Sequence, residues 1–182
     1  MTDSRLLFTL LVVLVAAERL VELVVTKRHA RRLAARGGRE VGRGHYPVMV
    51  LLHTGLLVTS IIEVWFLDRP FLPWLGWPAF AAVLLTMALR WWAITTLGDR
   101  WTTTVWVVPG EPPVGGGPYR WLRHPNYLAV AVEVVALPLV HTAWWTAVAF
   151  GVGNLVLLRH RIGVEEAALQ EAGRGLAVRS TP

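Results

Sequence analysis

Two short segments in the C-terminal half of the chain hold residue types that could bind a charged small molecule. The first, Arg123 to Tyr127, reads RHPNY and follows a long polar stretch. Its proline can begin a helix, whose first amides favour an anion, and Arg123 and His124 add side-chain donors at the same place. The local sequence fits a positively charged anchor at a membrane surface equally well, so both interpretations stay open at this level.

The second segment, RIGVEEAAL from Arg161 to Leu169, has the pattern of a helix with two adjacent carboxylates. Arg161 and Glu165 stand four residues apart and can pair on one face, so a solvated charged face is the simplest interpretation. If both segments lie at the same end of a bundle, Glu165 and Glu166 come near the donors of the first segment. That arrangement would suit one ligand with a cationic and an anionic end.

The elements that must position these segments are apolar helices of membrane length. The chain has 182 residues, 54% of them hydrophobic and 16% charged, with a mean hydropathy of +0.48, a balance that excludes an ordinary soluble domain. Runs of about 20 apolar residues can cross a hydrocarbon core of roughly 30 Å as a helix. We expect an all-α integral membrane bundle, residues 1–182, with five transmembrane spans near 6–25, 46–66, 77–97, 127–140 and 142–158.

The last two predicted spans form a helical hairpin, because Pro138, His141 and Thr142 interrupt the apolar sequence with turn chemistry. Residues 98–126 before the hairpin are long for a loop, and loops of that length are usually functional. Within this stretch, residues 101–108 are rich in Thr, Val and Trp and can pair as a short strand. The glycines at 115–117 permit close approach of the backbone to a ligand.

The distribution of Lys and Arg predicts the orientation of the bundle, since positive residues stay on the cytoplasmic side. Of the 18 basic residues, 14 fall after the first, third and fifth predicted spans and two, Arg5 and Arg69, fall on the other side. We therefore expect the N-terminus outside and the C-terminus in the cytoplasm. The tract 27–36 can form a short basic helix on the membrane surface. The net charge of +6 is a topology signal and does not indicate nucleic-acid binding.

Ionisable residues inside predicted spans must face the protein interior or a wet cavity. Mutual pairing and a functional site are both open for them. The chain has no cysteine and its six histidines show no paired spacing, so we expect no metal site. The residues inside predicted spans are Glu18, Arg19, Glu22, Glu63, Arg90 and Glu133.

Together, the two segments resemble the signature of the isoprenylcysteine carboxyl methyltransferase family. Residues 117–127 match GPYxxxRHPxY before a helical hairpin, and residues 161–169 match RIxxEExxL after it. The resemblance covers roughly the C-terminal half of the chain. It implies an integral membrane enzyme that moves a methyl group from S-adenosylmethionine, bound on the cytoplasmic side, to an oxygen of a lipid-like acceptor.

The resemblance also implies roles for individual residues. The two glutamates suit the ammonium group of the cofactor, while His124 with Arg123 or Arg120 suits its carboxylate. The chemistry of methyl transfer, as distinct from the resemblance, makes Arg161 the candidate catalytic residue, because it could hold an anionic acceptor oxygen beside the cofactor. Gly98 resembles a glycine near the end of the third span in related membrane methyltransferases. The implied cofactor-binding residues are Tyr119, Arg123, His124, Pro125, Tyr127, Glu165 and Glu166.

The chain departs from the family pattern after the second segment. Family members commonly continue with a Phe-Gly pair and tyrosines, whereas QEAGRG at 170–175 follows here, so we expect a different substrate-side lid. The Arg-, Ala- and Val-rich composition is typical of a bacterial cytoplasmic membrane protein. We therefore expect a small amphiphile as acceptor, such as an alkyl phenol, a pyrone or an isoprenoid acid, in place of a prenylated protein.

Two other functions stay open on the sequence. A phospholipid N-methyltransferase would carry similar glutamate pairs, and a non-catalytic small membrane protein would explain the apolar helices. A pore-forming protein would not require the long polar loop. The expected partners are the lipid bilayer and a lipophilic acceptor, and the sequence does not decide the oligomeric state.

Overall fold

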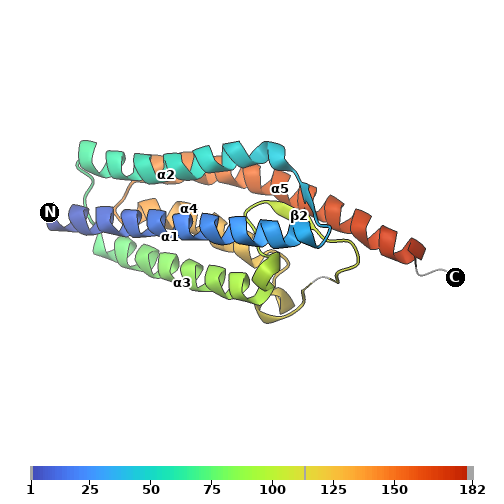
Figure 1. Cartoon of the computed structure of the whole chain (residues 1–182). Coiled ribbons are helices and arrows are strands. Elements are labelled where there is room, and N and C mark those ends of the chain that lie inside the picture. Colours follow the sequence, from blue (N-terminus) through green and yellow to red (C-terminus); the bar gives the residue numbers. More distant parts are fainter. Residues whose placement is uncertain (1, 113, 180–182) are drawn as a thin grey trace.

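The computed structural model describes residues 2–112 and 114–179, most of which are helical (Figure 1). Successive long helices run in opposite directions, so the α1–α2 connection, the α3–α4 connection and the second half of α5 meet at one end of the bundle. The N-terminus lies at the opposite end. The long helices are α1 (Thr2–Ala35), α2 (Tyr46–Phe66), α3 (Pro73–Leu97), α4 (Pro125–Leu139) and α5 (Trp144–Arg179).

Three segments of the described chain are long and apolar enough to cross a membrane: Arg43–Phe66, Pro73–Arg100 and Trp144–Glu171. α1 has the length, but Glu18, Arg19 and Glu22 interrupt its apolar sequence. α4 has 15 residues, which gives about 22 Å at 1.5 Å per residue. A helical membrane fold is therefore supported, while the count of five spans stays a prediction.

The first helix differs from the prediction, because residues 27–36 do not form a separate surface helix. Residues 27–35 continue α1 without a break, since no glycine or proline occurs between Leu6 and Ala35. The helix ends where Gly37 adopts a left-handed φ of 78° and the Gly38 amide donates to the Leu33 carbonyl oxygen at 2.9 Å. This is the usual glycine termination of a helix. The basic tract therefore extends beyond the apolar part of α1 as its last turns.

The interior of the bundle contains five ionisable side chains that pair with one another, here called the buried charge cluster: Glu18, Arg19, Glu22, Arg90 and Glu133. Arg19 contacts Glu22 at 2.7 Å and Glu133 at 3.2 Å. Arg90 contacts Glu133 at 3.3 Å and Glu22 at 3.5 Å. Mutual pairing thus accounts for these residues, and it joins α1, α3 and α4 in a region where an unpaired charge would be costly.

Glu63, the sixth ionisable residue in a predicted span, lies near the other end of the bundle. Its carboxylate accepts hydrogen bonds from the Thr146 amide at 2.7 Å and the Trp145 amide at 3.2 Å, and it pairs with Arg69 at 2.7 Å. A carboxylate at these amides complements the positive end of α5. Glu63 therefore fixes the start of α5 against the end of α2.

A two-stranded antiparallel sheet joins the two long connections at the end where they meet. Strand β1 (Arg39–Val41) pairs with β2 (Val105–Val107), with Arg39 opposite Val107. β2 lies inside the stretch 101–108 in which a strand is predicted, and it is shorter than that stretch. The end of α1 is held to the same loop, because Arg32 pairs with Asp99 at 2.5 Å.

Candidate functional site

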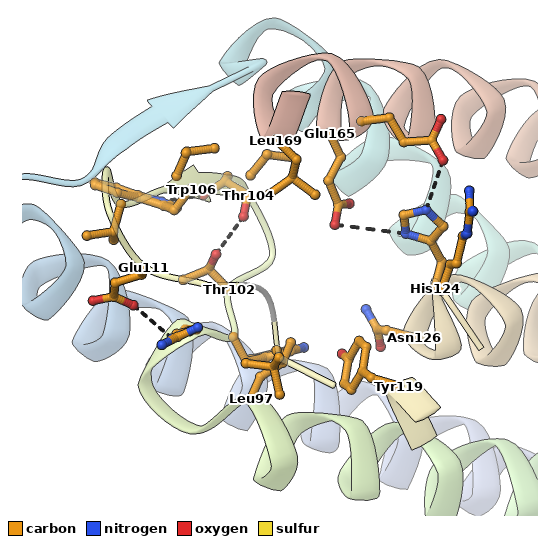
Figure 2. Close-up of a pocket in the computed structure, with 18 of the residues that line it drawn as sticks. Leu97, Thr102, Thr104, Trp106, Glu111, Tyr119, His124, Asn126, Glu165 and Leu169 are labelled. Atoms are coloured by element: carbon orange, nitrogen blue, oxygen red, sulfur yellow. Dashed lines mark hydrogen bonds and ion pairs between the residues drawn. The ribbon is translucent and has the colours of Figure 1, made fainter. Parts of the chain in front are cut away.

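A cavity of about 640 Å³ lies between the α3–α4 connection and α5 (Figure 2). One wall comes from β2 and its flanking residues, a second from residues 119–127, and a third from α5 between Arg161 and Gln170. The structure brings all eight predicted site residues to this cavity. They are Tyr119, Arg123, His124, Pro125, Tyr127, Arg161, Glu165 and Glu166.

The first motif is shaped by a short 3-10 turn followed by the start of α4. In the turn Gly117–Arg120, the Pro118 carbonyl oxygen accepts from the amides of residues 121 and 122. His124 then precedes α4, and Pro125 occupies its first turn, where a missing amide proton costs nothing. As a result the rings of His124 and Tyr127 stack on one side of the helix start, 5.3 Å apart and inclined by 19°.

The carboxylates of the second motif meet these rings from α5. His124 Nδ1 lies 3.9 Å from Glu165 Oε1, and His124 Nε2 lies 3.5 Å from Glu166 Oε1 (Figure 2). The Tyr127 hydroxyl donates a hydrogen bond to Glu165 Oε2. Segments 38 residues apart in the sequence therefore form one polar wall with both donors and carboxylates.

Arg161 lies deeper in the site and is 7% exposed. Its guanidinium carbon lies 5.2 Å from the centre of the Tyr127 ring, and Nη2 donates to the Thr103 carbonyl oxygen at 2.8 Å. Its Nε is buried and has no hydrogen-bond partner in the part of the chain that the structure describes. A buried donor without a partner is costly, so Arg161 retains capacity to bind an acceptor atom.

Tyr119 presents a neutral phenol to the site. Burial, and secondly the Glu165 carboxylate nearby, raise the pKa of the Tyr119 hydroxyl above its usual value. The group therefore stays protonated and can donate a hydrogen bond throughout the physiological pH range.

Some sequence expectations are not met at this site. Arg120 does not line the cavity, because its guanidinium lies 5.5 Å from the centre of the Trp121 ring. Arg123 lines the cavity but is exposed, so it reaches the ligand space from the rim. Gly98 follows α3 with a φ of 55° and is absent from the cavity lining. Of the arginines offered for the cofactor carboxylate, only Arg123 is therefore in place.

The glycine run also serves a different purpose from the one predicted. Gly117 has a φ of 52°, and a Cβ placed there would lie 2.3 Å from Thr96 Oγ1 of α3. The close approach allowed by this glycine is to α3, and Gly117 is not among the residues that line the cavity described above. Gly117 thus lets the 3-10 turn pack on the end of α3, which fixes the entry into α4.

Several lining residues were not predicted from the sequence. Glu111 pairs with Arg100 at 2.8 Å across the long loop, and Asn126 stands between the motif positions at the start of α4 (Figure 2). The strand preference of residues 101–108 signalled an ordered wall without showing which side chains face the cavity. Within the described residues, His, Asp and Glu form no group of three that could hold a metal ion.

A family model and two bacterial proteins match the sequence of this chain. The family model of isoprenylcysteine carboxyl methyltransferase (ICMT) matches residues 79–171. An uncharacterized Bacillus subtilis (strain 168) protein, YpbQ, is 36% identical over 166 residues, which are 91% of this chain and 98% of that protein. An uncharacterized protein of Haemophilus influenzae (strain KW20) is 26% identical over 156 residues, covering 85% and 90% of the two chains.

The fold is also found among solved structures. The structure of the eukaryotic intramembrane Ras methyltransferase ICMT matches with a TM-score of 0.51 and 24% sequence identity. The match covers 70% of this chain and 47% of that enzyme's chain, so the present chain spans about half the length of that enzyme. At this identity the likeness concerns the arrangement of helices.

Proposed function

The chain belongs to the isoprenylcysteine carboxyl methyltransferase family, and from this premise we propose that it is an S-adenosylmethionine-dependent O-methyltransferase that acts on a lipid-like small molecule in the membrane. The observation that carries the proposal is the polar wall formed by His124, Tyr127, Glu165 and Glu166 in one cavity. Family membership supports the membrane methyltransferase class. The oxygen acceptor and the cofactor are the proposal.

The residues of the cavity fit the amino-acid end of S-adenosylmethionine. That end carries one ammonium and one carboxylate group, and the wall offers two carboxylates beside the imidazole of His124. We assign the ammonium to Glu165 and Glu166 and the carboxylate to His124 and Arg123, because charge-assisted hydrogen bonds are the strongest available here. The phenol of Tyr119 and the start of α4 at Pro125 complete this wall.

The chemistry requires alignment more than acid or base groups. Bound S-adenosylmethionine supplies an electrophilic methyl group on a sulfonium, and the protein has to hold a nucleophilic oxygen in line with it. A carboxylate acceptor needs no base, whereas a phenol or enol needs its proton removed or its oxygen polarised. We assign Arg161 to that oxygen, since its buried Nε has no hydrogen-bond partner among the described residues and its guanidinium is held over Tyr127.

The placement of the site supports a cytoplasmic orientation. The last turns of α1, the α1–α2 and α3–α4 connections and the second half of α5 lie at the cavity end of the bundle, and together they carry most of the basic residues. Positive residues favour the cytoplasmic side, where S-adenosylmethionine is available. We therefore propose that five helices cross a bacterial cytoplasmic membrane, with the N-terminus outside and α4 supported by its neighbours across part of the bilayer.

The test is binding and transfer with tritiated S-adenosylmethionine on the full chain purified in detergent. We expect saturable binding and transfer of label to a long-chain alkyl phenol or an isoprenoid acid. Phosphatidylethanolamine serves as the comparison acceptor and should remain unlabelled. Labelling of phosphatidylethanolamine would show that the methyl acceptor is a nitrogen and would contradict the proposed oxygen acceptor. Absence of cofactor binding would contradict the methyltransferase function altogether.

A further inference from the structure

Asn126 lines the cavity and has no role in the site described so far. Figure 2 shows its side-chain amide between Tyr119 and His124. On its other side, Arg90 of α3 donates a hydrogen bond to Asn126 Oδ1 at 3.3 Å. A guanidinium has donors only, so the amide oxygen must face Arg90 and the amide nitrogen must point away from it. No described residue hydrogen-bonds this nitrogen, which leaves its two protons for the cavity.

Arg90 is itself held by the buried charge cluster. The residue is 4% exposed, with Nη2 3.3 Å from Glu133 Oε2 and Nε 3.5 Å from Glu22 Oε1. A guanidinium buried to this degree keeps its position, because breaking its ion pair with either carboxylate would cost free energy. The orientation of Asn126 is thus set by charges on α1 and α4 that lie outside the cavity.

We propose that Asn126 is a further ligand-binding residue, whose amide nitrogen donates a hydrogen bond to an anionic oxygen of the bound ligand, and that Arg90 is its positioning residue. The inference rests on the proposed function. It follows from the surroundings of Asn126, because the start of α4, His124 and Arg123 all present positive or donor groups to the same space. The oxygen can belong to the cofactor carboxylate or to the methyl acceptor.

Two substitutions separate a ligand contact from a structural contact. Asn126→Asp keeps an acceptor for Arg90 but turns the cavity-facing donor into an acceptor, whereas Asn126→Leu removes both. If Asn126 serves only as a partner of Arg90, the aspartate variant should bind ligands like the unmodified protein. We expect both variants to lose at least about 10-fold in affinity for the ligand that carries the oxygen, S-adenosylmethionine by calorimetry or the acceptor by its KM, while Asn126→Asp keeps its unfolding temperature.

Decarboxylated S-adenosylmethionine identifies the oxygen. If the cofactor carboxylate is the partner, Asn126→Asp and the unmodified protein should bind the decarboxylated compound equally. If the methyl acceptor is the partner, cofactor binding should be unchanged and the KM for a long-chain alkyl phenol should rise at least about 10-fold. The inference would be overturned if Asn126→Asp matched the unmodified protein in both the cofactor-binding assay and the acceptor assay. It would also be overturned if the variant lost the same affinity for S-adenosylmethionine and for its decarboxylated form.

The role of Arg90 is tested with Arg90→Lys. Lysine keeps the charge for Glu22 and Glu133 but lacks the planar fork that reaches Asn126 at the same time. We expect a several-fold loss of ligand affinity that disappears when Asn126→Asp is already present, since the two residues act as one unit. The matched control is Arg69→Lys, the same exchange in an ion pair with Glu63 that lies at the end of the bundle away from the cavity. It should leave ligand binding unchanged.

If the affinity losses of Arg90→Lys and Asn126→Asp are additive in the double variant, Arg90 does not position Asn126. Failure of the inference and failure of the proposed function give different results. An unmodified protein that binds no S-adenosylmethionine rejects both proposals. Normal binding by the unmodified protein, with Asn126→Asp unaffected in the cofactor and acceptor assays, rejects the inference alone.

Discussion

Glu165 is the residue at which the two sequence motifs meet. It accepts a hydrogen bond from the Tyr127 hydroxyl and lies 3.9 Å from the His124 ring, while its neighbour Glu166 approaches the same ring from the next position of α5. Its side chain is 29% exposed, so it is partly desolvated yet open to a ligand. A carboxylate in that state gains more from an ammonium partner than a fully solvated one does.

We expect Glu165→Gln and His124→Ala each to weaken S-adenosylmethionine binding. Each removes one partner of a charge-assisted hydrogen bond, worth about 1.5 to 3 kcal/mol, so the loss should be roughly 10- to 150-fold. Calorimetry on the purified full chain measures it. Glu40→Gln is the matched control, because Glu40 pairs with Arg43 near the same end of the bundle and does not line the cavity. Unchanged binding in both site variants would return these residues to structural roles.

At the scale of elements, the 3-10 turn Gly117–Arg120 connects the long loop to α4 and thereby places His124. Gly117→Ala should strain this turn, because its φ is 52° and the new Cβ would lie 2.3 Å from Thr96 Oγ1. Backbone strain of this kind costs about 1 to 3 kcal/mol. We expect a lower unfolding temperature together with weaker cofactor binding, since the start of α4 has to shift.

Gly115→Ala is the control for that experiment. A Cβ added at Gly115 would meet no atom within 4 Å, and this glycine does not adopt a positive φ, so its variant should unfold and bind like the unmodified protein. Equal behaviour of the two alanine variants in thermal unfolding and calorimetry would show that the packing of the turn on α3 does not position α4.

The elements also show what the sequence could and could not predict. Apolar run lengths and turn residues located the helices well, because membrane thickness and backbone chemistry act locally: α2 and the predicted span 46–66 coincide. The fusion of residues 27–36 with α1 was missed, since a charge-rich surface helix and a continued helix have the same local pattern. β1 was also missed, because a strand of three residues is too short to show the alternating pattern by which a strand is predicted.

The sequence predicted those site residues that belong to the two motifs. It did not predict residues whose place in the site depends on contacts between distant parts of the chain. The eight residues named from the motifs line one cavity, although their roles remain predictions. The role proposed for Asn126 could not be inferred from the sequence, because it rests on a hydrogen bond from Arg90, 36 positions earlier in the chain. The contact of Gly117 with Thr96 is likewise a long-range packing event that no local rule contains.

At the scale of the whole molecule, the proposed orientation in the membrane rests on the charge distribution and the alternating helix directions. Reporter fusions at Gly38 and at Ser180, which lies outside the described residues, should both read cytoplasmic, and a fusion at Trp74 should read external. Gly38 follows α1 and Trp74 begins α3, which places them at opposite ends of the bundle. An external signal at Ser180 would contradict the five-span arrangement.

The acceptor is the remaining property that belongs to the whole molecule, and it follows from where cofactor and membrane meet. The cavity has its charged wall at one end of the bundle, while the helices expose large apolar side chains such as Leu51, Leu85 and Trp145 along their length. An acceptor with an oxygen-bearing head and a hydrocarbon tail would dissolve in the bilayer and present its head at the depth of Arg161.

We therefore expect turnover to rise as the alkyl chain of a test phenol or acid is lengthened at fixed aqueous concentration, and then to level off. Each methylene moved from water into an apolar phase is worth about 0.8 kcal/mol, so the tail concentrates the acceptor in the membrane until partitioning is complete. Transfer of tritiated methyl in proteoliposomes measures turnover across this series. Repeating the series with Arg161→Lys separates partitioning of the tail from binding of the head group, because partitioning is a property of the acceptor alone. The variant should turn over every acceptor more slowly with the same dependence on length. Equal turnover of tail-less and long-chain acceptors at the same low aqueous concentration would show that the substrate reaches the cavity from water, and would contradict a membrane route for the acceptor.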